Sequence, residues 1–191
     1  MTTPSGSPHP KPKNSKKRAI RHHPMLSWID AKFVHRPRIY ISQALLAGLA
    51  LIGILIAEDA LASGDAVIVA AIASSVAIVF FVPHSVASSP FRLIGGHISA
   101  IVAALCTVGI MLLLPDSIAT HQWTIHALQG ASLALVILIM TVTNTEHAPA
   151  AGTALGLATS VPLNSVIFIV SAAVIISLVR IALYKHLHNL I

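Results

Sequence analysis

The chain has 191 residues, of which 55% are hydrophobic and only 9% are charged, and its mean hydropathy is +0.84. A soluble domain carries about 25% charged residues, so this composition excludes a water-soluble globular protein and favours an integral membrane protein. The formal net charge of +6 does not indicate nucleic-acid binding, because neither interleaved aromatic side chains nor a recognisable nucleic-acid-binding module accompanies it.

The N-terminal end carries most of the basic residues. Nine of the 12 Lys and Arg residues precede Ile39, and basic residues before an apolar segment place that end in the cytoplasm. Residues 1–23 lack apolar periodicity and are predicted to be disordered. Residues 24–38, with Trp28 and Phe33, are predicted to lie at the membrane interface. We therefore expect a basic tail over 1–38 and a transmembrane domain over 39–191.

Five apolar segments follow, and each approaches the roughly 20 residues that a helix needs to cross a bilayer. They are Ile39–Ala57, Ala66–Val82, Gly95–Leu114, His126–Val142 and Ser165–Tyr184. Short polar connections separate them; Glu58, Asp59 and Asp65 are assigned to the first connection. The predicted fold is all-α, a polytopic transmembrane helical bundle.

Residues 150–161 are apolar but too short to cross the bilayer alone, and Pro162 follows them. Such a run favours a re-entrant or broken helix. If it re-enters, the chain has five spans and its C-terminus lies outside. If it crosses, there are six and Lys185 lies inside. The length favours five spans plus the short helix; Arg180 and Lys185 favour six.

Polar residues at the ends of apolar segments form two motifs. The first, Pro90 to His97, includes Gly95 and Gly96. The second, Thr145 to Leu155, contains Glu146, His147-Ala148-Pro149, Gly152 and Thr153. Ionisable residues at membrane depth are costly and typically functional. Small residues spaced by four after each motif allow close helix packing.

Across residues 40–185, these two motifs resemble those of the HPP family of integral membrane proteins, named for a His-Pro-Pro motif followed by small residues. The chain departs from the family at Ala148, where the family has its first Pro; this removes a constraint on the backbone of His147. The resemblance implies a membrane transport role, with nitrite as the leading substrate, because some plastid and cyanobacterial members are associated with nitrite transport. Members fused to paired CBS domains also exist, but this chain has no room for such a pair.

A small anion needs partial positive charge without a fixed cation that would trap it. Helix N-termini, hydroxyls and imidazoles supply this. We expect a transporter or channel for a small inorganic anion, with its site at the motif helix N-termini. Glu146 is the candidate for proton exchange with His147. The predicted substrate-binding residues are His84, Gly95, Gly96, His97, His147, Pro149, Gly152 and Thr153.

Structural roles compete with these functional ones. The glycines suit helix packing, His97 could bond a neighbouring span, and His147 could close its turn. Ser74 and Ser75 are interpreted as interhelical contacts. A non-transport structural or regulatory membrane protein is therefore the alternative function.

No hydrolase or metalloenzyme pattern is present, so we expect no enzyme activity, no cofactor and no metal site. The expected partners are membrane lipids, a small anion and a second copy of the chain in a homo-oligomer, but not nucleic acid. The expected location is a bacterial inner (plasma) membrane, with the N-terminus cytoplasmic.

Overall fold

The computed structural model describes residues 31–61 and 65–190. The predicted disorder of residues 1–23, most of the 1–38 tail and Trp28 therefore lie outside the described residues. Helix α1 (Ala31–His35) belongs to a separate unit that ends at His35. The unit from Arg36 onward contains α2 (Pro37–Leu61), α3 (Ala66–Phe81), the 3-10 turn η1 (Val86–Ser88), α4 (Pro90–Leu112), α5 (Asp116–Ala119), α6 (Gln122–Thr143), α7 (Ala150–Leu157) and α8 (Leu163–Leu183).

The four longest helices are suited to crossing a membrane. Helices α2, α4, α6 and α8 have 21 to 25 residues and mean hydropathies of 2.0 to 2.7, whereas α3 is apolar but has only 16 residues. At 1.5 Å per residue, each long helix matches a hydrocarbon layer of about 30 Å. The predicted all-α transmembrane bundle, with a short helix after the second motif, is confirmed: four helices are long enough to span, and α3 is a shorter apolar helix.

Local capping moves two helix boundaries away from their predicted positions. Helix α4 begins at Pro90 rather than at Gly95, because the Ser89 side chain accepts a hydrogen bond from the Arg92 N–H and proline suits the first helical position. Glu58 and Asp59 lie in the last turn of α2, not in a connection. The connection instead ends at Asp65, whose carboxylate caps α3.

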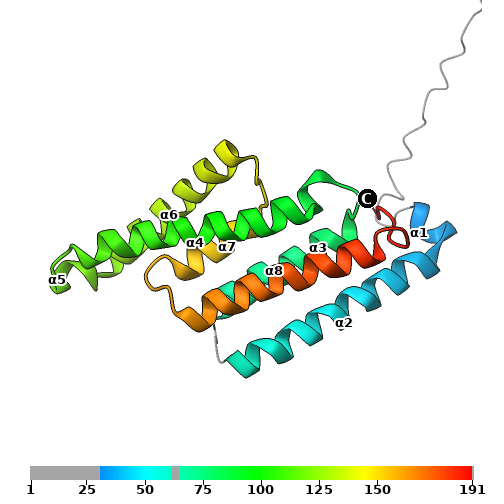
Figure 1. The fold of residues 1–191 in the computed structure, drawn as a ribbon, viewed down its shortest axis with the longest axis horizontal. Coiled ribbons are helices and arrows are strands. Elements are labelled where there is room, and N and C mark those ends of the chain that lie inside the picture. Colours follow the sequence, from blue (N-terminus) through cyan, green and yellow to red (C-terminus); the bar gives the residue numbers. More distant parts are fainter. Residues whose placement is uncertain (1–30, 62–64, 191) are drawn as a thin grey trace, which may run out of the picture. The chain divides into compact units, whose positions relative to one another are not determined.

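The segment from Asn144 to Pro162 runs from one end of the bundle to the other. Its beginning packs on α4 near Gly95, and Gly156 packs on Ile68 near the start of α3. The Asn164 side chain then donates to the carbonyl of Leu61, the last residue of α2. Helix α7 is therefore the helical part of a broken crossing (Figure 1).

Both ends of the unit from Arg36 to Leu190 meet on one side of the bundle. The Tyr40 hydroxyl donates to the Leu190 carbonyl at 3.0 Å, and Figure 1 shows α8 returning towards the beginning of α2. An even number of crossings follows. These contacts favour the six-crossing arrangement over the re-entrant one, which would place the C-terminus on the opposite side.

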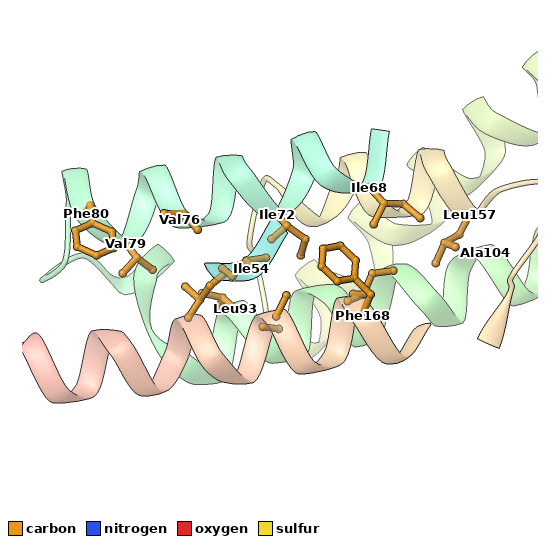
Figure 2. Close-up of a cluster of buried hydrophobic side chains, with 14 of the residues drawn as sticks. Ile54, Ile68, Ile72, Val76, Val79, Phe80, Leu93, Ala104, Leu157 and Phe168 are labelled. Carbon is orange, nitrogen blue, oxygen red and sulfur yellow. The ribbon is translucent and has the colours of Figure 1, made fainter. Parts of the chain in front are cut away.

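The largest apolar cluster lies along one face of α3. The buried face consists of residues spaced by three or four along α3, together with the neighbour of the last one, and it faces α8, α4 and α7 (Figure 2). These residues are Ile68, Ile72, Val76, Val79 and Phe80. Lipid is as apolar as these side chains, so their contribution in a membrane comes from close packing rather than from burial away from water. This packing holds α3 against the helices that carry the motifs.

The carbonyl groups at the end of α7 find partners on neighbouring helices. Ser132 of α6 donates to the Ala154 carbonyl at 3.0 Å, and Thr107 of α4 donates to the Ala158 carbonyl at 2.9 Å. Backbone that leaves a helix inside a membrane needs such partners, because hydrocarbon offers none. The broken crossing is thus held within protein.

Candidate functional site

Ser75, in the middle of α3, joins the two motif histidines. Its hydroxyl oxygen lies 3.0 Å from Nε2 of His97 and 3.0 Å from Nε2 of His147. The Ala71 carbonyl oxygen, one turn earlier in the same helix, is 3.1 Å away. Ser75 and His147 are 0% exposed and His97 is 1% exposed. A three-residue polar centre therefore lies fully enclosed among apolar helices.

Each imidazole uses its second nitrogen for a further contact. Nδ1 of His97 lies 3.0 Å from the Thr153 hydroxyl on α7. Nδ1 of His147 lies 3.1 Å from the Ala87 carbonyl oxygen in η1. The histidine cluster is defined as Ser75, His97, His147 and Thr153. It connects α3, α4, α7, η1 and the non-helical residues 144–149, which we call the break before α7.

The contacts fix one complete arrangement of protons for neutral histidines. A carbonyl oxygen only accepts, so His147 donates from Nδ1 to Ala87 and its Nε2 accepts from Ser75. The Ser75 oxygen then accepts from Nε2–H of His97. Nδ1 of His97 accepts from the Thr153 hydroxyl. In this arrangement every ring nitrogen is satisfied, as burial requires.

The backbone break that carries His147 has its own supports. Asn144 ends α6 in the left-handed conformation with φ 57°, and its N–H donates to the Met140 carbonyl. Asn tolerates this region better than most residues. Arg92 donates to the Asn144 side chain at 2.6 Å and forms an ion pair with Glu146. The carboxylate proposed to exchange protons with His147 is therefore paired with Arg92.

The predicted glycines mark close backbone packing. A Cβ added to Gly95 would lie 2.5 Å from Thr145 Cγ2, and one added to Gly96 would lie 2.7 Å from His147 Cβ. A Cβ at Gly152 would lie 3.0 Å from Ala71 Cβ. The expectation that Gly95 and Gly96 open a helix N-terminus is wrong, because α4 begins one turn earlier at Pro90.

The start of α7 is closed by its own backbone. The N–H groups of Ala150, Ala151 and Gly152 donate to the carbonyl oxygens of His147, Ala148 and Pro149, at 2.9, 3.1 and 3.0 Å. These are three of the groups that a helix N-terminus would offer to an anion. In this conformation the polar chemistry of the second motif lies in its side chains, above all in His147.

His84 lies in a different cluster from His97 and His147. Its Nε2 is 2.9 Å from the Leu187 carbonyl oxygen, its backbone N–H donates to Asn189, and its ring packs edge-on against Tyr184. It anchors the C-terminal segment to the connection between α3 and α4. The prediction grouped it with the other two histidines, but these contacts place it elsewhere.

A groove of about 410 Å³ borders the cluster. It runs between α3 and the second motif, and its lining residues include the sequence neighbours of Ser75 and His147. They are Ser74, Ala77, Ile78, Phe81, Ala148 and Pro149. The groove is mostly apolar, and the enclosed ring nitrogens do not line it.

Sequence reasoning assigned Ser75 a helix-packing role and so missed its place between the histidines. The available signal was weak, since adjacent serines are ordinary in membrane helices. Arg92 lies within the first motif and received no role from the sequence, although it contacts Asn144 and Glu146. Both contacts join residues far apart in the sequence, which motif spacing does not reveal.

The comparisons with known proteins agree with the arrangement of helices and motifs. The family model described as the HPP transmembrane region matches residues 33–190. No match was found among the curated proteins or among the solved structures. The match covers all the membrane helices and both motifs. The chain therefore belongs to the HPP family of integral membrane proteins.

Proposed function

We propose that this protein moves a small inorganic anion across the membrane, as a transporter or channel without enzymatic activity. The observation that carries the proposal is the histidine cluster, where two imidazoles meet at membrane depth. Polar groups are expensive there and typically mark substrate or ion pathways. Nitrite is the first candidate because of its association with some HPP proteins. The protein would act in a bacterial plasma membrane, surrounded by lipid, as a homo-oligomer and without a cofactor.

Imidazole N–H groups suit the recognition of a small anion. His147 directs its Nδ1–H at the Ala87 carbonyl oxygen, at 3.1 Å. An anion would take the place of that acceptor, since a charged acceptor forms a stronger hydrogen bond than a neutral carbonyl. Because the cluster is enclosed in this conformation, the proposed cycle requires η1 to separate from the break before α7.

A second function, as a structural or regulatory membrane protein, is favoured by one feature of the same cluster. Every ring nitrogen of His97 and His147 already has a partner within the chain. In that alternative the cluster serves only to tie α3, α4, α7 and η1 together. The two functions differ in what happens when a histidine is removed from a protein that stays folded.

Anion flux into proteoliposomes tests the proposal directly. Purified protein would be reconstituted and uptake of nitrite, nitrate and chloride measured against protein-free liposomes. We expect protein-dependent uptake of at least one anion. It should be lost in His147→Ala and retained in His186→Ala, because His186 is exposed.

Elution as a single species and thermal stability in detergent would be measured on the same preparations. A folded His147→Ala protein that lacks flux supports the proposal. Flux that persists at the wild-type rate in His147→Ala, or the absence of protein-dependent flux for the anion panel, would favour the structural alternative.

A further inference from the structure

The Ser75 hydroxyl of the histidine cluster can rotate between two acceptors, Nε2 of His147 and the Ala71 carbonyl oxygen. With both histidines neutral, the single Ser75 proton is directed to Nε2 of His147, and the Ala71 carbonyl oxygen at 3.1 Å receives none. That carbonyl is a spare acceptor within reach of the same hydroxyl. This second acceptor allows the Ser75 hydroxyl to turn away from His147 when His147 gains a proton.

A proton added to the Nε2 lone pair of His147 is accommodated without loss of a contact. His147 then donates from both nitrogens, to Ala87 and to Ser75. The Ser75 oxygen uses its two lone pairs to accept from Nε2–H of His97 and of His147, and its own proton turns to the Ala71 carbonyl oxygen. The Thr153 contact with His97 does not change. The neutral and singly protonated clusters are both fully hydrogen-bonded.

Among the described residues packed around it, the protonated cluster nevertheless lacks a negative partner. Glu58 and Asp59 of α2 and the α3 cap Asp65 lie at the start of α3, at the other end of that helix from η1. Helices α3 and α7 and the turn η1 carry no ionisable side chain. On α4 and the break before α7, Arg92 and Glu146 are paired with each other. From α8, Arg180 donates to the Pro83 carbonyl oxygen and Ser88, and His84 is bonded to Leu187. An enclosed imidazolium without a counter-charge is strongly disfavoured.

We propose that the cluster takes up a proton and a monovalent anion together, with the anion supplying the missing counter-charge. The proton comes from the aqueous phase and adds to His147; the anion pairs with the resulting imidazolium. Transport is then electroneutral, one proton with each anion. This inference rests on the proposed anion transport and names the ion that is coupled to it.

The ratio of protons to anions tests the coupling. Proteoliposomes containing a trapped pH indicator would receive nitrite or nitrate while potassium and valinomycin hold the membrane potential. We expect anion entry to acidify the lumen with one proton per anion. An inward acid gradient should drive uptake, and a change in membrane potential at fixed pH should leave the rate unchanged. Nitrate is included because protein-free liposomes leak nitrous acid.

Ser75→Ala removes the hydroxyl that accepts from both histidines, and Ser171→Ala is its matched control. Ser171 bonds the Ile167 carbonyl oxygen within α8, so its loss should leave the ratio at one. Ser75→Ala should lower acid-driven uptake at least tenfold. Ser75→Thr, which keeps a hydroxyl, should retain a ratio of one. If Ser75→Ala does not fold, the wild-type ratio and the Ser75→Thr protein still decide the question.

Failure of the inference differs from failure of the proposed function. Protein-dependent anion uptake that follows the membrane potential and carries no protons would overturn the coupling and leave anion transport in place. Unchanged acid-driven uptake in folded Ser75→Ala would also overturn it. No protein-dependent anion uptake under either driving force would overturn both.

Discussion

Gly96 is the residue at which α4 packs against His147 of the histidine cluster. A Cβ there would meet His147 Cβ at 2.7 Å and the Thr145 carbonyl oxygen at 3.2 Å. Neither is the far end of a flexible side chain, so the backbone would have to move. The glycine pair did indicate close backbone approach in the sequence, but the group approached is the protein's own chain rather than an anion.

Gly96→Ala should therefore destabilise the protein by about 1–3 kcal/mol, the usual cost of overpacking a close contact. The shift of His147 should also reduce anion flux. Gly109→Ala in the same helix is the matched control, because nothing lies within 4 Å of its added Cβ. Alanine favours a helix over glycine by about 1 kcal/mol, so the control should be as stable as wild type or slightly more so.

Thermal unfolding of both variants in detergent checks this prediction. Equal melting temperatures for Gly96→Ala and Gly109→Ala would mean that the break before α7 yields readily and does not hold His147 in place.

At the scale of elements, α7 depends on hydroxyl groups from its neighbours. Thr107→Val keeps the shape of the side chain but removes a hydroxyl that lies 2.9 Å from the Ala158 carbonyl oxygen, in a fully buried residue, and 2.9 Å from the Ala104 carbonyl oxygen of its own helix. Leaving a buried carbonyl without a partner costs about 1–3 kcal/mol. We expect the free energy of unfolding to fall by that amount, which lowers the melting temperature. We also expect faster hydrogen exchange in residues 150–158.

Thr141→Val is the control for this change. Thr141 is exposed on α6 and donates only to the Ile137 carbonyl of its own helix, so its loss should have little effect. If Thr107→Val exchanged no faster than Thr141→Val over residues 150–158, the hydroxyl of Thr107 would not be holding the end of α7.

The elements differ in how far the sequence determines them. Apolar runs bounded by polar residues located the long helices to within a few residues, since the bilayer fixes their length. The path of α7 depended on contacts such as Asn164 with Leu61, which composition does not encode. The residues of the site also differ in how far the sequence indicates them. His97 and His147 stood out because ionisable residues are costly at membrane depth. The role of Ser75 depends on the packing of three segments that are distant in the sequence.

At the scale of the whole molecule, the C-terminal segment closes the bundle through Gln43. The Gln43 side chain donates to the carbonyl oxygens of Phe80 and His188, at 2.5 and 2.8 Å, and accepts from the His188 N–H at 3.0 Å. Phe80 lies at the end of α3, where helix carbonyls lack partners. One side chain thus joins α2, α3 and the segment after α8.

Gln43→Leu should release this segment and lower stability by about 1–3 kcal/mol, because buried carbonyl groups lose their donors. Limited trypsin digestion, followed by mass spectrometry, should show faster cleavage after Lys185. Ser42→Ala serves as the control, since Ser42 is exposed and bonds the Ile39 carbonyl in its own helix. Equal cleavage rates in the two variants would show that Gln43 does not retain the segment.

The distribution of charge over the bundle predicts its orientation. Lys and Arg between residues 36 and 190 lie at the side where the two ends of this unit meet; they are Arg36, Arg38, Arg92, Arg180 and Lys185. The opposite side carries acidic residues, namely Glu58, Asp59, Asp65 and Asp116. The positive-inside rule places the basic side in the cytoplasm, together with the basic residues that precede Ile39.

Cysteine labelling of cells expressing single-cysteine proteins tests both the orientation and the even number of crossings. In a Cys106→Ala background, Ser117→Cys should react with an impermeant maleimide from outside, because Ser117 is exposed on the short helix α5 after α4. Ser15→Cys and His186→Cys should react only after the membrane is opened. The reverse labelling pattern at all three positions would show that the protein has the opposite orientation in the membrane. Labelling of Ser15→Cys and His186→Cys from opposite sides would instead contradict the broken crossing, because one terminus would then have changed sides.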